Sequence, residues 1–207
     1  MSFQASVGPS HRSPIRPTII RQAQATSNYN VTLSQTPLFG SILLVSCYQN
    51  TGTSNPLISG GGVSAWNLIA GVANGGANNT AGACWWGKVD GTPSASLSAG
   101  PNGASSACGT VVEVLGLVGV NRGSGGIASG GTATGPSITS TGEGVVFFFG
   151  GAQAITNIPQ GLLTAAFASA NGRSCYALYS ARRLGSGVSI GLHMNGNQVC
   201  TGAIVLA

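Results

Sequence analysis

Few residues of this chain can transfer protons. Its 207 residues contain three acids and two histidines: Asp90, Glu113, Glu143, His11 and His193. A glycosidase site would need two of the carboxylates to converge. Asp90 precedes a glycine in a hairpin signal, and Glu113 alternates with valines on an expected strand, which predicts a solvent-facing side chain. The sequence therefore predicts a protein that is not an enzyme.

One pentapeptide, Gly187-Val188-Ser189-Ile190-Gly191, matches the G-x-S-x-G pattern of a nucleophile elbow. An elbow needs a turn from a strand into a helix, followed later in the chain by an acid and a histidine. No acid follows Ser189, and the local alternation of side chains places this serine on a strand. We interpret the match as chance.

The five cysteines all lie in strand-like runs: Cys47, Cys84, Cys108, Cys175 and Cys200. Buried free thiols are the favoured interpretation. Two disulfides, Cys84–Cys108 and Cys175–Cys200, are the alternative. No cysteine or histidine spacing typical of zinc occurs, so we expect neither a metal nor a cofactor.

Adjacent aromatic and basic pairs are the remaining candidates for binding. Trp85 and Trp86 must point to opposite faces of a strand. One is expected in the core, and the other either stacks on a sugar, packs in a subunit interface, or is covered by a loop. Arg182 and Arg183 either bind an anion or a partner's carboxylates, or form a solvated strand end.

Composition indicates an all-β protein. Charged residues make up 5% of the chain, glycines number 34, and only one of the eight basic residues is a lysine, whereas helix exteriors are normally covered by Glu and Lys. No apolar run reaches membrane-spanning length, and no secretory signal opens the sequence. Basic residues do not cluster along most of the chain, so a nucleic-acid partner is not expected. We expect synthesis in a host cytoplasm.

The chain also resembles itself. Cys84 aligns with Cys175, and Cys108 aligns with Cys200 when a gap of one residue is allowed. The further matches are Trp85-Trp86 with Tyr176-Ala177, Ser96-Leu97 with Ser189-Ile190, and Asn102-Gly103 with Asn195-Gly196. We predict two diverged repeats of about six strands each, at 31–118 and 136–207, joined by a linker at 119–135. Together, residues 30–207 would form a jelly-roll-like β-sandwich of about twelve strands.

Residues 1–29 form a segment of different composition, which we call the arm. It is proline-rich, contains no acid, and has little strand period beyond Thr18–Ile20. An extended arm becomes ordered by lying on another surface. That surface belongs to its own domain, to a sister subunit or to a larger assembly, and the assembly is the favoured interpretation. Its expected contact residues are Arg12, Ile15, Arg16, Ile19, Ile20 and Arg21.

Three stretches carry a resemblance to known proteins. They are Gly62-Val63-Ser64-Ala65-Trp66-Asn67-Leu68-Ile69-Ala70, then Trp85-Trp86-Gly87-Lys88-Val89 with Gly91, then Val111-Val112-Glu113-Val114-Leu115-Gly116-Leu117. Their rhythm resembles that of β-sandwich proteins in tailed-phage virions and of modules in some bacterial surface proteins. These motifs are structural, and the resemblance extends loosely over residues 31–207.

The resemblance implies a virion structural protein, and among such proteins a capsid decoration (cement) protein fits the arm best. Its expected partners are the major capsid protein and sister subunits, for instance in a trimer on the capsid surface. The alternative is a phage tail, fibre or surface module that binds a receptor or a glycan.

Overall fold

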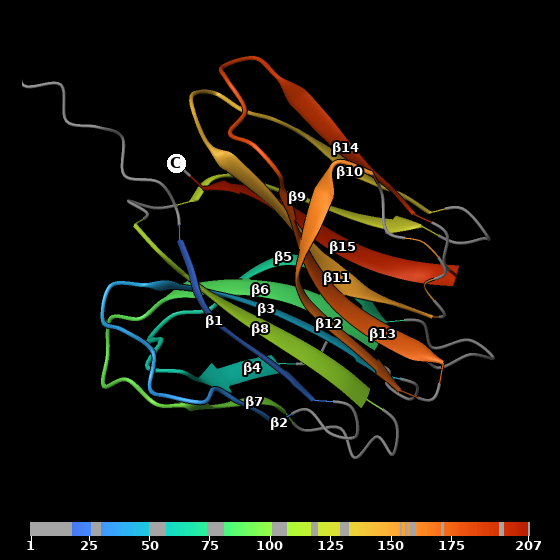
Figure 1. Cartoon of the computed structure of the whole chain (residues 1–207). Helices are drawn as coiled ribbons and strands as arrows, with labels where there is room; N and C mark the ends of the chain where they lie inside the picture. Colours follow the sequence, from blue (N-terminus) through green and yellow to red (C-terminus); the bar gives the residue numbers. More distant parts are fainter. Residues whose placement is uncertain are drawn as a thin grey trace, which may run out of the picture.

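The computed structural model of this chain describes residues 18–25, 30–49, 57–73, 81–100, 107–116, 120–128, 133–153, 155, 157, 160–170, 172–194 and 197–206. These residues form fifteen strands and no helix (Figure 1). The predicted all-β class is confirmed, although about twelve strands had been expected. Because the described residues contain no helix, none of them belongs to a helical span that could cross a membrane.

Two large antiparallel sheets form the centre of the molecule. The first large sheet has the order β1-β8-β3-β6-β5, with bounds β1 Thr18–Ala25, β8 Ala107–Leu115, β3 Ile42–Gln49, β6 Ala81–Lys88 and β5 Asn67–Ala73. The second large sheet has the order β12-β13-β11-β15-β9, with bounds β12 Leu162–Ala170, β13 Arg173–Ser180, β11 Val145–Gln153, β15 Asn197–Leu206 and β9 Val120–Ala128.

Each large sheet carries a small sheet on its outer face (Figure 1). The first small sheet has the order β2-β7-β4, with bounds β2 Asn30–Thr32, β7 Ser96–Gly100 and β4 Leu57–Gly60. The second small sheet pairs β10 (Ala133–Thr139) with β14 (Ser189–Met194). The four sheets are therefore stacked with the two large ones in the middle.

The central strands read as continuous apolar runs because both of their faces are covered. On β3, Ile42 and Leu44 belong to the cluster between the large sheets, whereas Leu43 and Val45 belong to the cluster under the first small sheet. On β11 the inner and outer faces carry alternate phenylalanines in the same way: Phe147 and Phe149 inside, Phe148 outside. Strands buried on both faces lose the polar alternation of a half-exposed sheet.

Glycines allow a tyrosine to fill the space between the large sheets. Tyr48 is fully buried. A Cβ on Gly151 of the facing sheet would lie 2.4 Å from the Tyr48 Cβ, and one on Gly82 of the neighbouring strand would lie 2.7 Å from its ring. Both glycines are therefore required by close packing against this side chain.

The described strands of each half of the chain pair only with strands of the same half. The pairing is nested, because the first strand of a half pairs with its last, and the second with its second-last. In residues up to Leu115, β1 pairs with β8, β2 with β7 and β3 with β6. From Val120 onward, β9 pairs with β15, β10 with β14, and β11 with β13. The first large sheet, β1-β8-β3-β6-β5, corresponds strand by strand to β9-β15-β11-β13-β12 in the second. In the small sheets, β2 and β7 correspond to β10 and β14, and β4 has no counterpart among the described strands.

The structure has strands in two segments where the sequence predicted little or none. The arm contains strand β1, and the predicted linker 119–135 contains β9 and the start of β10. In β1 a register shift between Ile19 and Arg21 interrupts the period of two, so the strand is hidden from pattern reading. In β9 the glycine-rich sequence VNRGSGGIA lacks a strand composition, and pairing to β15 defines the strand instead.

Candidate functional site

A recess opens where the start of β1 faces the end of β13. It has a volume of about 500 Å³ and lies between β1, an edge strand of the first large sheet, and the β11–β13 pair of the second. It is lined by Thr18, Ile19, Val145, Phe147, Tyr179, Ser180, Ala181, Arg182 and Arg183. We call this the β1–β13 recess.

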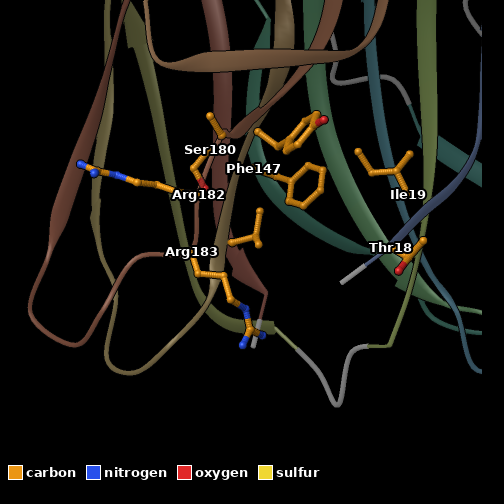
Figure 2. Close-up of a pocket in the computed structure, with 9 residues that line it drawn as sticks. Thr18, Ile19, Phe147, Ser180, Arg182 and Arg183 are labelled. Carbon is orange, nitrogen blue, oxygen red and sulfur yellow. The ribbon is translucent and has the colours of Figure 1, made fainter. Parts of the chain in front are cut away.

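Two stacked aromatic rings form its apolar side. The rings of Phe147 and Tyr179 lie 5.6 Å apart between centroids, at an interplanar angle of 26°. They are neighbours because Phe147 of β11 pairs directly with Tyr179 of β13, and cross-strand aromatic pairs of this kind stabilise a sheet. Figure 2 shows Ile19 of β1 opposite Phe147, so the recess has apolar groups from both large sheets.

Two arginines stand at the rim of the recess. The backbone of Leu184 exchanges hydrogen bonds with Gly144, at 2.9 and 3.1 Å, and this pairing fixes the turn that carries Arg182 and Arg183. Arg182 is exposed and extends away from the aromatic rings (Figure 2). Arg183 lies 3.3 Å from the carboxylate of Glu143, which is itself 67% exposed.

The recess thus combines an apolar side with cations at its mouth. Arginine binds carboxylates through charge-assisted hydrogen bonds. Arg183 already has the carboxylate of Glu143 as a partner, so anion binding and a solvated strand end both remain open for this arginine pair.

Glu113 has a role that the sequence analysis did not foresee. The prediction that its side chain faces solvent is wrong, because this carboxylate is fully buried. Arg21 Nη1 donates a hydrogen bond to its Oε2 at 2.6 Å, and the Leu38 backbone N–H donates to its Oε1 at 2.7 Å. Arg21 also donates to the side chain of Gln35. The signal in the sequence was a single acid inside the apolar run Val111–Leu117.

The other two carboxylates, those of Asp90 and Glu143, each make contacts of their own away from Glu113. Asp90 accepts hydrogen bonds from the hydroxyl and the backbone N–H of Ser64, at 2.7 and 2.9 Å. These bonds lower the pKa of Asp90 below its usual value. Glu143 is the exposed partner of Arg183. Within the described ranges no three His, Cys, Asp or Glu side chains are grouped as a metal site would require.

The arm residues expected to contact a capsid fall into two groups. Arg12, Ile15 and Arg16 lie outside the described residues. Ile19, Ile20 and Arg21 belong to β1, where Ile19 packs against the central core and Arg21 pairs with Glu113. Ile19 and Arg21 therefore make contacts inside the molecule, and contact of the arm with a capsid stays a prediction.

Neither tryptophan of the 85–86 pair is fully exposed. Trp86 packs against the core between the large sheets, and Trp85 packs with Cys47, Ala83 and Ile58 on the other face. The expected opposite orientation is confirmed, and both side chains are half-buried. The aromatic pair of the recess, Phe147 and Tyr179, was not identified from the sequence.

All five cysteines are buried free thiols. The two alternative disulfides predicted from the sequence join residues that the structure holds apart. Cys175 and Cys200 both lie opposite Gly151, on either side of β11, and β3 separates the strands of Cys84 and Cys108. Two strand spacings amount to about 9.6 Å, too far for a disulfide. Instead the Sγ atoms of Cys108 and Cys175 lie 2.8 Å apart.

Comparison with known proteins gives no further guide. No protein-family model, no curated protein and no solved structure matches this chain.

Proposed function

We propose that this chain is a non-enzymatic virion structural protein, a capsid decoration protein of a tailed phage, built as two jelly-roll-like β-sandwich repeats. Its function is adhesion: it binds the outer surface of the shell, next to sister subunits, and stabilises it. The nested strand pairing carries this proposal. Pairing first with last, second with second-last and third with third-last is what wrapping one long hairpin produces, and jelly rolls of this kind are typical of viral capsid and lectin domains.

The duplication is supported by equivalent positions in the two halves. Cys108 lies opposite Tyr48, and Cys200 lies opposite Gly151, on the corresponding pairs of strands. Ser96-Leu97 and Ser189-Ile190 occupy the same places at the starts of β7 and β14. The pairing registers place Gly82, and not Cys84, at the position of Cys175, so this part of the sequence alignment needs a shift of two residues.

A non-enzymatic role is supported by the use of the three carboxylates. Glu113 neutralises Arg21 in the interior, Asp90 organises a turn through Ser64, and Glu143 accompanies Arg183 at the surface. A hydrolase would need two of them, or one with a histidine, at a single cleft.

Attachment would use the end of the molecule at the β1–β13 recess. Residues 1–17, which contain Arg12 and Arg16, join the described structure at Thr18 on the wall of that recess. Arg182 and Arg183 stand at its rim. The exposed Arg182 would act at this end of the protein, on a partner surface that presents carboxylates.

A truncation that spares β1 tests this proposal. Removal of all of residues 1–29 would also remove Arg21 and strand β1, so the chosen variant lacks residues 2–17 only. Particles from cells expressing each form are purified, and copies per particle are counted by quantitative mass spectrometry. We expect hundreds of copies of the full chain and a large loss with the truncation or with Arg182→Glu. A handful of copies of the full chain would indicate a tail protein, and unchanged binding of both variants would contradict attachment through this end.

A glycan-binding module is the second candidate, favoured by the aromatic and arginine lining of the recess. Phe147 is fully buried, but the half-buried ring of Tyr179 could stack on a sugar, and arginine would bind an acidic sugar's carboxylate. A glycan array separates the two functions: selective binding of acidic glycans that Arg182→Glu abolishes would favour the module, and no binding would favour decoration.

A further inference from the structure

Two cysteines meet across the interface between the two large sheets. Cys108 lies on β8 of the first half, and Cys175 lies on β13 of the second. Their Sγ atoms are 2.8 Å apart, nearer than the ~3.5–4.0 Å at which unbonded heavy atoms make optimal contact. Both side chains are fully buried, in one cluster with Tyr48 and Ala168. The packing of the sheets thus presses these two sulfurs together.

We propose that Cys108 and Cys175 form a disulfide that cross-links the two halves of the chain. The bond would join the two large sheets, whose described strands pair only within their own half. It would thereby turn an interface held by side-chain packing into a covalent one. A protein that persists outside a cell would gain from such a cross-link, because disulfides endure in oxidising surroundings.

The oxidant would be a small disulfide such as oxidised glutathione. The thiolate of one cysteine attacks it, forms a mixed disulfide and releases one glutathione thiolate. The second cysteine loses its proton and attacks the protein sulfur of that mixed disulfide, which releases the second glutathione. The two protein thiols are oxidised, and one glutathione disulfide is reduced to two thiols. Burial raises the pKa of Cys175, so the exchange takes place during folding, before the sheets close.

The other thiols contact backbone carbonyls, as Cys175 Sγ also does toward the Cys108 carbonyl at 3.0 Å. Cys84 Sγ is directed at the carbonyl oxygens of Phe149 and Cys200, at 3.0 and 3.8 Å. Cys47 Sγ is directed at the carbonyl of Ala83 at 3.6 Å, in a cluster on the outer side of the sheet with Trp85. Cys47, Cys84 and Cys200 are expected to stay reduced when Cys108 and Cys175 are joined.

Trypsin can distinguish the possible pairings, because basic residues are few. Cleavage after Lys88, Arg122, Arg173 and Arg182 places Cys108 in peptide 89–122 and Cys175 in peptide 174–182. Cys47 and Cys84 share peptide 22–88, and Cys200 lies in peptide 184–207. A link between 89–122 and 174–182 therefore identifies Cys108–Cys175 alone, because each of these two peptides contains a single cysteine.

The full chain is refolded in a glutathione redox buffer, unfolded in denaturant with N-ethylmaleimide, digested and analysed without reduction. We expect three alkylated cysteines and a linked pair of peptides 89–122 and 174–182. Five alkylated cysteines, or a linkage between 22–88 and 184–207 or any other pair, would overturn the proposal.

Two variants provide the matched controls. In Cys47→Ser the link between 89–122 and 174–182 should persist, with two cysteines alkylated. In Cys175→Ser the link should vanish, with four alkylated. Reductant should lower the urea midpoint of the wild type and of Cys47→Ser, and should leave that of Cys175→Ser unchanged. An equal fall in all three would contradict a stabilising cross-link at this place.

Discussion

Arg21 and Glu113 face each other across the pairing of β1 with β8, and their ion pair of 2.6 Å lies in the interior of the protein. The Glu113 side chain has no exposed surface, whereas 14% of the Arg21 side chain is exposed. The ion pair thereby attaches β1 to β8, a strand that lies far downstream in the chain. This relationship gives the first prediction.

Arg21→Ala should destabilise the fold strongly. The substitution leaves the Glu113 carboxylate buried without a countercharge, and breaking a buried pair in this way costs about 3–5 kcal/mol. The measurement is the free energy of unfolding from urea denaturation. Glu143→Gln is the control, because it breaks an ion pair whose carboxylate is largely exposed, and its expected loss is below about 1 kcal/mol. Equal losses for the two variants would contradict a buried pair.

Gly151→Ala should force the large sheets apart. The added methyl would lie 2.4 Å from the Cβ of Tyr48, and overpacking of this kind costs typically about 1–3 kcal/mol. Gly185→Ala is the matched change, since nothing lies within 4 Å of the added atom. The urea midpoints of the two variants should differ clearly, and a fall confined to Gly185→Ala would show that the sheets are packed differently.

The protein should lose stability at alkaline pH. Burial raises the pKa values of Cys47 and Cys84 above the ordinary 9.0, and that of Tyr176 above 10.0. Above pH 9 the unfolded chain therefore releases protons that the folded chain retains, so the stabilisation present below pH 9 is lost as the pH rises. Each such group contributes a slope of about 1.4 kcal/mol per pH unit.

Denaturation at pH 7 and at pH 10 tests the alkaline loss. Cys47→Ala should reduce it by the share of one group, because that variant has one fewer thiol to ionise when unfolded. A loss that is the same in both proteins would exclude Cys47 from the effect.

Tyr176 and Thr201 should show a favourable coupling energy. Both lie opposite Gly150, on the two strands that flank β11, and their hydroxyl groups form a buried hydrogen bond. Tyr176→Phe leaves the Thr201 hydroxyl without this partner, at a cost of about 1–3 kcal/mol. The double variant with Thr201→Val should lose less than the sum of the single losses. Additive losses would contradict the bond.

The sequence permitted a correct fold class, because short β-branched runs and dense turn signals are typical of strands. It did not permit the boundaries of β1 and β9. Pairing partners far along the chain determine these two strands, and neither the shifted register near Ile19 nor the glycines of β9 leaves a period of two.

The candidate site was predictable only in part. Arg182 and Arg183 were recognisable as neighbouring cations, but the aromatic rings beside them come from β11 and β13, and their meeting depends on strand register. Glu113 was misplaced because alternation with valines usually indicates a half-exposed strand. On a strand covered on both faces the same alternation carries no such information.

The closed pairing of each half affects the order in which the protein can fold. Every described strand from β1 to β8 has its hydrogen-bonding partners within that half. During synthesis, the first half can therefore complete its sheets while the second is still being made. β1 must wait until β8 leaves the ribosome, since its described partner is more than 80 residues downstream, so this step should be the slow one in forming the first half.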